Sequence, residues 1–389
     1  MERVLPDRLY LDHAATTPVT SAAVTAMRRG IDMWANPSSP HSEGRAARAA
    51  LEEARAVIGA AYGWTGEVLL TSGASESLAI ALGRSIAGER IISAVEHDAV
   101  LRAAGEGART VSVGSDGIVD LPALGDALAT TLPITGGTVR TSNPAATPAG
   151  ELGDLQPGRG AGRAIVGVQW CNSETGVQQP LGEIAQIVHD ADALLLVDAA
   201  QMPASGELAD IADFVALSSH KRGGPPGIGA LLVRDLATLA PTGGQERGYR
   251  PGTENLPAAL GYAAALGEPE PDLAPLRYRL DDAIRRSGGL VVGEGAPRHP
   301  AIGSYRLPSV AANAQLIRLD LAGISVSAGS ACASGSLKPS HVLRAMGWSE
   351  DATREVIRVS FGRSTTMTDV DRFIAAWRDM ARGARVLAA

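Results

Sequence analysis

Short apolar runs alternate with longer amphipathic stretches through the first two thirds of the chain. Apolar runs of strand length occur at residues 67–71, 90–95, 111–113, 164–168, 193–197 and 211–217. Apolar positions at helical spacing occupy 43–62, 77–87 and 181–191. Strands and helices in alternation predict an α/β fold with a mixed, mostly parallel sheet between helices.

The pattern changes beyond residue 262. Arginine-rich helices are expected at 276–286 and from 368 to about 382, with shorter strands between them. We therefore predict a large domain over residues 14–262, and a smaller α+β domain formed by residues 1–13 and 263–389. Residues 127–163 are rich in Gly, Pro, Thr and Ala and are expected to be a flexible surface insertion.

Composition narrows the class of protein. The chain has 389 residues, 45% hydrophobic and 20% charged, with a net charge of -7. This argues against nucleic acid or an anionic membrane as a partner. The start of the sequence lacks an apolar signal region and no run reaches membrane-spanning length, so we expect a cytoplasmic protein. Its two cysteines and seven histidines lack metal-ligand spacing, so no metal site is expected.

Lysine is scarce, which makes its positions informative. Only Lys221 and Lys338 occur among 35 basic residues. A lysine amine whose pKa is lowered can attack an aldehyde, whereas an arginine cannot. Lys221 follows a strand in Ser218-Ser219-His220-Lys221 and is thus a candidate anchor for an aldehyde cofactor, although a lone His-Lys pair more often lies on an exposed turn.

Polar residues collect where the predicted strands end. They are Glu96-His97, Asn172-Ser173-Glu174, Asp198 to Gln201 and Ser218 to Lys221. The carboxyl ends of parallel strands form one lip, where ligands bind. Asp198 could pair with a pyridinium nitrogen there or simply cap the next turn.

A strand, a turn of small residues and a helix succeed one another at residues 67–87. The helix N-terminus, with the hydroxyls of Ser72 and Ser75, could bind a phosphate. Serine and glycine also cap many helices that bind nothing.

The second domain contains two further candidates. Residues 325–336 consist almost entirely of small side chains, so this stretch is expected to be a mobile loop that carries Cys332 as a nucleophile. Cys171 lies in an apolar strand and is expected to be structural. Arg358 and Arg363 lie near a strand end and suit a substrate carboxylate, although surface ion pairing is their default role.

Taken together, these motifs resemble the cysteine desulfurases of the class V aminotransferase group, dimeric pyridoxal 5'-phosphate (PLP) enzymes of fold type I. The resemblance covers nearly the whole chain. It rests on motifs at residues 10–18, 36–41, 71–77, 96–97, 198–201, 218–221, 243–253, 327–334 and 339–343. The Gly329-Ser330-Ala331-Cys332 motif resembles the first of the family's two groups, which serves iron-sulfur cluster assembly and tRNA thiolation.

The resemblance implies a role for individual residues. Lys221 would carry PLP, Asp198 would pair with its ring nitrogen, and His97 would stack on the ring and assist proton transfer. Gln201 would bind the ring oxygen. The phosphate would lie between residues of one subunit and Thr253 of the other, so the site requires a homodimer. The remaining cofactor-binding and substrate-binding residues would be Ala74, Ser75, Ser218 and His220 for the phosphate, and Asn36 and Arg358 for the substrate carboxylate.

The resemblance also implies a reaction. L-cysteine would give L-alanine while its sulfur passes to Cys332 as a persulfide. The loop of about 325–338 would deliver that sulfur to an acceptor such as an iron-sulfur scaffold protein.

The sequence departs from the family pattern at several positions. Ser173 stands where asparagine is usual, and its cofactor-binding role would be that of a shorter hydroxyl. Ser75 stands where threonine is usual, and the insertion at 127–163 is longer than expected. Two alternatives stay open: a selenocysteine lyase or another class V PLP enzyme, which would not need Cys332, and a non-enzymatic PLP-binding scaffold.

Overall fold

The structure is a computed structural model that describes residues 8–131, 163–328 and 339–388, with side chains up to residue 383. The helices are α1 (Ser21–Asp32), α2 (Ser42–Ala61), α3 (Ala74–Arg84), α4 (Asp98–Ala104), α5 (Leu121–Ala129), α6 (Leu181–Asp190), α7 (Leu256–Leu266), α8 (Ala274–Arg286), α9 (Ala312–Leu321), α10 (His341–Ala345), α11 (Glu350–Thr353) and α12 (Met367–Ala388). The strands are β1 (Leu9–Tyr10), β2 (Glu67–Thr71), β3 (Glu89–Ser93), β4 (Arg109–Val111), β5 (Ala164–Gln169), β6 (Leu194–Asp198), β7 (Phe214–Ser218), β8 (Gly229–Val233), β9 (Leu290–Val291), β10 (Ile302–Arg306), β11 (Ile324–Ser325), β12 (Ser327–Ala328) and β13 (Val356–Ser360).

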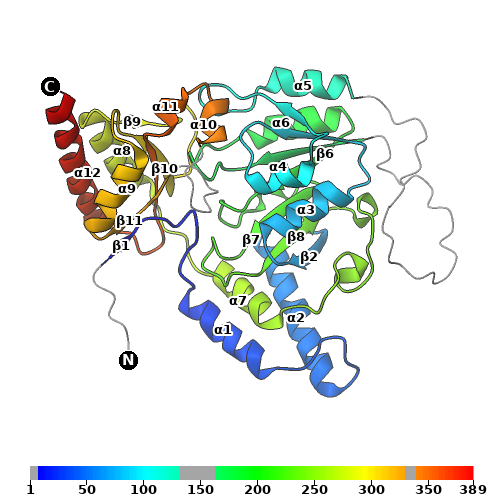
Figure 1. Ribbon diagram of the computed structural model, residues 1–389. Coiled ribbons are helices and arrows are strands. Elements are labelled where there is room, and N and C mark those ends of the chain that lie inside the picture. Colours follow the sequence, from blue (N-terminus) through cyan, green and yellow to red (C-terminus); the bar gives the residue numbers. More distant parts are fainter. Residues whose placement is uncertain (1–7, 132–162, 329–338, 389) are drawn as a thin grey trace.

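A seven-stranded sheet forms the centre of the larger part of the molecule (Figure 1). Its order is β2-β8-β7-β6-β5-β3-β4, and only β8 runs antiparallel to its neighbours. The prediction of a mixed, mostly parallel sheet is therefore confirmed.

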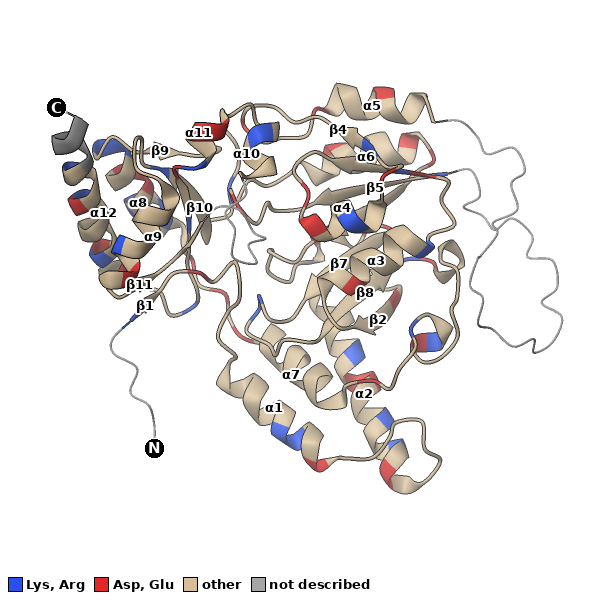
Figure 2. Ribbon diagram, viewed as in Figure 1, with Lys and Arg blue, Asp and Glu red and all other residues tan. Residues whose placement is uncertain are grey.

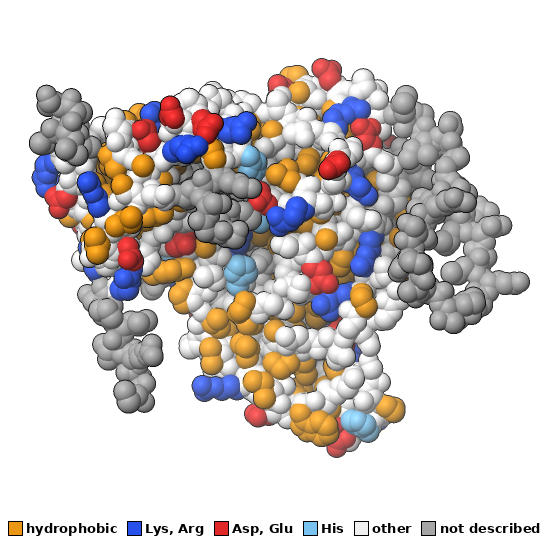
Figure 3. All heavy atoms as spheres, viewed as in Figure 1, with side chains coloured by type: hydrophobic (Ala, Val, Ile, Leu, Met, Phe, Trp, Pro, Cys, Tyr) orange, Lys and Arg blue, Asp and Glu red, His pale blue; other side chains and the backbone are white. Residues whose placement is uncertain are grey.

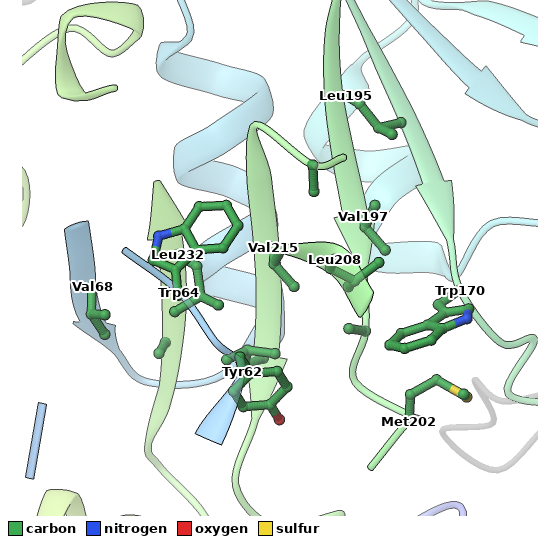
Figure 4. Packing of buried hydrophobic residues seen from close by; sticks show 14 of the residues in the cluster. Tyr62, Trp64, Val68, Trp170, Leu195, Val197, Met202, Leu208, Val215 and Leu232 are labelled. Atoms are coloured by element: carbon green, nitrogen blue, oxygen red, sulfur yellow. The ribbon is translucent and has the colours of Figure 1, made fainter. Parts of the chain in front are cut away.

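Alternation along each strand fills both faces of this sheet. In β6, Leu195 and Val197 join a cluster with α2, α5, α6 and α7, whereas Leu194 and Leu196 join one with α3 and α4. Figure 4 shows the first of these clusters, in which side chains from several neighbouring strands pack together. Strands β5, β6, β7 and β8 are buried along their whole length, whereas the edge strand β4 has an exposed residue.

The smaller part contains an antiparallel sheet in the order β12-β13-β10-β9, beside the parallel pair of β1 and β11. Its separate apolar cluster includes Tyr305 of β10 and the fully buried Trp377 of α12. Figure 2 shows charges of both signs on the helices that cover it, and Arg279 of α8 pairs with Asp371 of α12 at 2.9 Å. The predicted domain bounds, 14–262 and 1–13 with 263–389, stay a prediction.

Two predicted loops differ from the structure at their edges. The insertion was predicted to begin at residue 127, but residues 127–129 close α5, and residues 132–162 lie outside the described residues. The cysteine loop was predicted to begin at residue 325, yet Ser325 belongs to β11 and Ser327–Ala328 form β12. Backbone pairing with β1 and β13 needs no large side chains, which explains these short strands. The rest of the loop, with Cys332, lies outside the described residues.

No described helix has the length and apolarity that a membrane span requires.

Candidate active site

A cavity of about 440 Å³ opens at the carboxyl ends of the central strands. Most of the polar residues that were expected to share one lip of the sheet line this cavity, whereas Glu96, Asn172 and Glu174 do not. The lining includes Ala14, Ala15, Ser72, Gly73, Ala74, Ser75, His97, Ser173, Asp198, Gln201, Ser218, His220, Lys221, Ser327 and Arg358.

Helix α3 begins at the wall of this cavity. Its N-cap residue, Gly73, has φ 150° and offers no side chain to the first N–H groups of the helix. A Cβ at Gly73 would meet no atom within 4 Å, so the space in front of the helix is open. The hydroxyl-bearing Ser75 and Ser218 line the same cavity. An unblocked helix N-terminus beside hydroxyls is a site for an anion such as a phosphate.

This helix start is held in place by a salt bridge. Glu76 accepts a hydrogen bond from the Ser72 N–H at 2.5 Å and one from Arg250 Nε at 2.9 Å. Arg250 comes from the distant 243–253 segment, so that segment is tied to the start of α3. Sequence reasoning did not single out either residue, because nothing local in the sequence pairs them.

Asp198 and Lys221 place a carboxylate and an amine in the same cavity. Asp198 ends β6 and is 9% exposed, and its Oδ1 accepts the Ala200 N–H at 3.0 Å. Burial lowers the pKa of Lys221 to about 8, with Arg358 and Arg222 acting in the same direction and Asp198 opposing them. Near neutral pH, more of this amine is therefore unprotonated than in an ordinary lysine, and the unprotonated form can attack a carbonyl.

His97 follows β3 and caps helix α4. Its Nδ1 accepts the Ala99 N–H at 3.1 Å, so in the neutral ring the proton is on Nε2. Burial, followed by the positive charge of Lys221, lowers the pKa of His97. Gln201 is held by a hydrogen bond from its Nε2 to the Ala14 carbonyl at 3.0 Å, in the wall of the cavity.

Arg358 enters the cavity from the smaller sheet. It lies on β13, opposite Ser327 of β12, and its side chain is 3% exposed. Its Nη1 donates to the Ser173 carbonyl at 2.9 Å, and its Nη2 donates to Asp12 Oδ1 at 2.7 Å. Ser173 therefore contributes its backbone to the position of Arg358, whatever its hydroxyl does.

Three of the predicted site residues are not brought to this cavity by the single chain. Asn36 is exposed, and its Oδ1 accepts the Ser38 N–H at 2.8 Å. Thr253 is also exposed and does not line the cavity. Cys332 lies outside the described residues. The roles of all three stay predictions.

The second cysteine is buried, as expected. Cys171 is 2% exposed, and burial raises its pKa to about 12. A neutral thiol in the core is a poor nucleophile, which fits a structural role. Among the described residues, no cluster of His, Cys, Asp and Glu has the arrangement of a metal site.

Comparison with protein-family models matches the class V aminotransferases at residues 9–132 and 134–373. The chain belongs to the class V aminotransferase family. The expected family is thus confirmed, and with it an enzyme rather than a binding scaffold.

Two curated relatives and one solved structure are similar to nearly the whole chain. A cysteine desulfurase from Cereibacter sphaeroides is 35% identical, over 95% of this chain and 94% of its own. Cysteine desulfurase IscS 1 from Archaeoglobus fulgidus is 33% identical, over 94% of each chain. The X-ray structure of a NifS-like protein from Rickettsia africae has a TM-score of 0.80 at 28% identity and covers 96% of this chain and 99% of its own. These similarities confirm the fold of PLP-dependent transferases of type I.

The cavity of this family member fits PLP. The open helix N-terminus at Gly73 suits a phosphate, the buried Asp198 suits a protonated ring nitrogen, and Lys221 is an amine of lowered pKa in the same cavity. The donor set is thus the one that an anionic, aldehyde-bearing pyridine requires.

Proposed function

We propose that this protein is a PLP-dependent cysteine desulfurase, which converts L-cysteine to L-alanine and holds the released sulfur as a persulfide on Cys332. The observation that carries the proposal is the cavity in which Lys221, Asp198 and Arg358 meet beside the open start of α3. The full-length similarity to relatives named cysteine desulfurases supports the choice of reaction.

The cofactor would be held by residues from several elements. Lys221 would bond to it covalently, Asp198 would pair with the ring nitrogen, and Gln201 would donate to the ring oxygen. Ser173 lines the cavity, where its hydroxyl could reach the same oxygen. The phosphate would be bound by the residues Ala74, Ser75, Ser218 and His220, with Thr253 from a partner subunit.

PLP, when bound, supplies an electron sink for negative charge at the substrate Cα. Arg358 binds the substrate carboxylate and thereby orients the Cα bonds. The amine of Lys221, when free, would act as the base that takes the Cα proton, which its lowered pKa favours. His97, with its proton on Nε2, is a neutral donor beside Lys221 and assists that transfer.

The sulfur step requires a second nucleophile. The Cys332 thiolate attacks the substrate sulfur, so the C–S bond of cysteine breaks as an S–S bond forms. The electron pair of the C–S bond stays on carbon, which is then protonated to give L-alanine. The persulfide is passed to an acceptor, for which we propose an iron-sulfur scaffold protein in the cytoplasm.

A homodimer would complete the site. The segments that carry Asn36 and Thr253 are neighbours, because Ser38 Oγ donates to Gln245 Oε1 at 3.3 Å. Figure 3 shows hydrophobic side chains gathered over the part of the surface where α1, α2 and α7 lie in Figure 1. Trp34, just beyond α1, is 79% exposed. Contact of so large an apolar side chain with water is unfavourable, and a partner subunit that covers this surface would remove that contact. We propose that a second copy covers it and brings its Asn36 and Thr253 to the cavity.

The reaction can be tested with purified holoenzyme. Without reductant, L-cysteine should yield about one alanine per subunit and a persulfide on Cys332. With reductant, alanine and sulfide should form continuously. Lys221→Ala and Cys332→Ala should abolish turnover, whereas Cys171→Ala, the matched cysteine control, should retain it. If Cys332→Ala released sulfide at the wild-type rate, the persulfide route would be wrong and a lyase would be the better account.

A further inference from the structure

The guanidinium of Arg358 already contacts a carboxylate of this chain. Asp12 Oδ1 accepts from Nη2 at 2.7 Å, and the Ser173 carbonyl accepts from Nη1 at 2.9 Å. Each terminal nitrogen of an arginine carries two N–H bonds, so one on each has no partner among the described residues and could bind a ligand. A carboxylate from the cavity would therefore have to share this guanidinium with Asp12.

Hydrogen bonds of the backbone around Asp12 hold this residue in place, in addition to its contact with Arg358. On one side, Ser360 N–H donates to the Leu11 carbonyl at 2.8 Å, and on the other, Ala14 N–H donates to Ser360 Oγ at 2.9 Å. The Tyr10 hydroxyl donates to the Asp12 carbonyl at 3.0 Å. Asp12 thus lies in bridge register with Ser360, two residues beyond Arg358 on the same strand. This backbone pairing places the carboxylate of Asp12 next to the arginine.

We propose that Asp12 is a positioning residue that orients Arg358 and limits its affinity for the carboxylate of the amino acid. The proposal rests on the proposed function, in which Arg358 binds an α-amino acid. Asp12 holds the guanidinium through Nη2, and its negative charge repels a second carboxylate on the same group. The effect is confined to ligands that carry a carboxylate, because the repulsion acts on that group alone.

The test separates charge from orientation. Asp12→Asn removes the charge but keeps an oxygen that can accept from Nη2. With PLP-loaded enzyme, the change in cofactor absorbance on titration gives dissociation constants for L-alanine and for ethylamine, which lacks the carboxylate. We expect Asp12→Asn to lower the dissociation constant of L-alanine about tenfold and to leave that of ethylamine within about twofold. The KM for L-cysteine should fall in the same direction.

Two further variants serve as comparisons. Asp371→Asn makes the same change of net charge in an exposed pair with Arg279 and should shift neither constant. Asp12→Ser, a second neutral variant with an acceptor oxygen, should shift L-alanine in the same direction as Asp12→Asn.

The proposal is overturned if L-alanine binds equally or more weakly in Asp12→Asn, or if ethylamine shifts equally. It is also overturned if both Asp12 variants lose PLP or the folded state, since Asp12 would then support the fold. Wild-type enzyme that binds L-alanine but makes none from L-cysteine would refute the proposed function and leave the role of Asp12 standing.

Discussion

Glu246 is buried at the edge of the large sheet, beside the edge strand β2, and its removal should destabilise the protein severely. The residue is 3% exposed, and its carboxylate accepts from Arg55 Nη1 at 2.5 Å, Arg55 Nη2 at 3.1 Å and the Leu70 N–H at 2.8 Å. Both Glu246 and Arg247 have positive φ, 49° and 58°, which non-glycine residues rarely adopt. The ion pair therefore also holds a strained turn in place.

The magnitude follows from what Glu246→Gln leaves behind. The amide has one acceptor oxygen for three donors, and its NH₂ would face the guanidinium of Arg55. Removing one partner of a buried ion pair costs about 3–5 kcal/mol. Glu52, whose Oε2 lies 3.0 Å from Arg55 Nε, partly compensates the remaining charge, so we expect a loss at the lower end, about 3 kcal/mol in the free energy of unfolding.

Urea denaturation of the apoprotein, followed by circular dichroism, measures this loss. Glu294→Gln is the matched control, since its pair with Arg285 is about half exposed and should contribute less than about 1 kcal/mol. The double variant Arg55→Met with Glu246→Gln should lose much less than the sum of the single changes, because no charge is left buried. A loss below about 1 kcal/mol for Glu246→Gln, or additive losses in the double variant, would refute the reasoning.

Three further outcomes are expected. The rate at which apoprotein binds PLP covalently should rise with pH through about 8, because burial lowers the pKa of Lys221 and only the neutral amine reacts; absorbance measures it, and a midpoint near 10.5 would contradict it. Gly229→Ala should weaken PLP binding in equilibrium titrations, since a Cβ there would lie 2.6 Å from the Cα of Gly73, whereas Gly182→Ala, whose Cβ meets nothing within 4 Å, should not; equal affinities would exclude the steric argument. Trp377→Ala should cost about 3–5 kcal/mol in chemical denaturation because its side chain is fully buried, and a cost under about 1 kcal/mol would show that the apolar cluster around it repacks.

Strands β5, β6 and β7 could be predicted from sequence because they are buried along their whole length, whereas β8 (Gly229–Val233), which follows a glycine-rich turn, was not predicted. Residues 164–168 and 193–197 form continuous apolar runs, and the structure has β5 and β6 there within one residue. The polar residues at the strand ends follow from the same pattern. Because the strands that they follow run parallel, their carboxyl ends lie at the same edge of the sheet, so these residues can be expected to lie close together.

Element ends were less predictable, because side chains decide them. The run 90–95 was expected to be a strand, but β3 ends at Ser93. The Val95 carbonyl accepts instead from the side chains of Gln169 at 2.5 Å and Asn172 at 3.0 Å. Helix α3 was expected to begin at Ser77, but it begins at Ala74, with Gly73 as its N-cap. The small residues between these positions suit a turn as well as a helix, so the pattern did not show where the helix begins.

Contacts between distant residues could not be predicted from local pattern. The motif of residues 10–18 contributed to the resemblance, but its Asp12 has no local feature that identifies Arg358 as its partner. The two are joined only after β13 pairs with the segment before α1. The exposed positions of Asn36 and Thr253 likewise depend on how the chain folds and not on their motifs.

The chemistry of the cavity therefore depends on how the smaller sheet is docked on the larger one. Lys221, Asp198 and His97 come from the large sheet, whereas Arg358 arrives on β13. Two hydrogen bonds to Glu174 join the parts, one from Ser304 Oγ to its carbonyl at 2.7 Å and one from Ser340 Oγ to its carboxylate at 2.5 Å. Ser340 also caps α10, the first described helix after Cys332 in the chain. A displacement of the smaller sheet would thus move Arg358 relative to Lys221. In the proposed function, where Arg358 binds the substrate carboxylate, the two residues that hold its guanidinium, Asp12 and Ser173, would control the catalytic geometry.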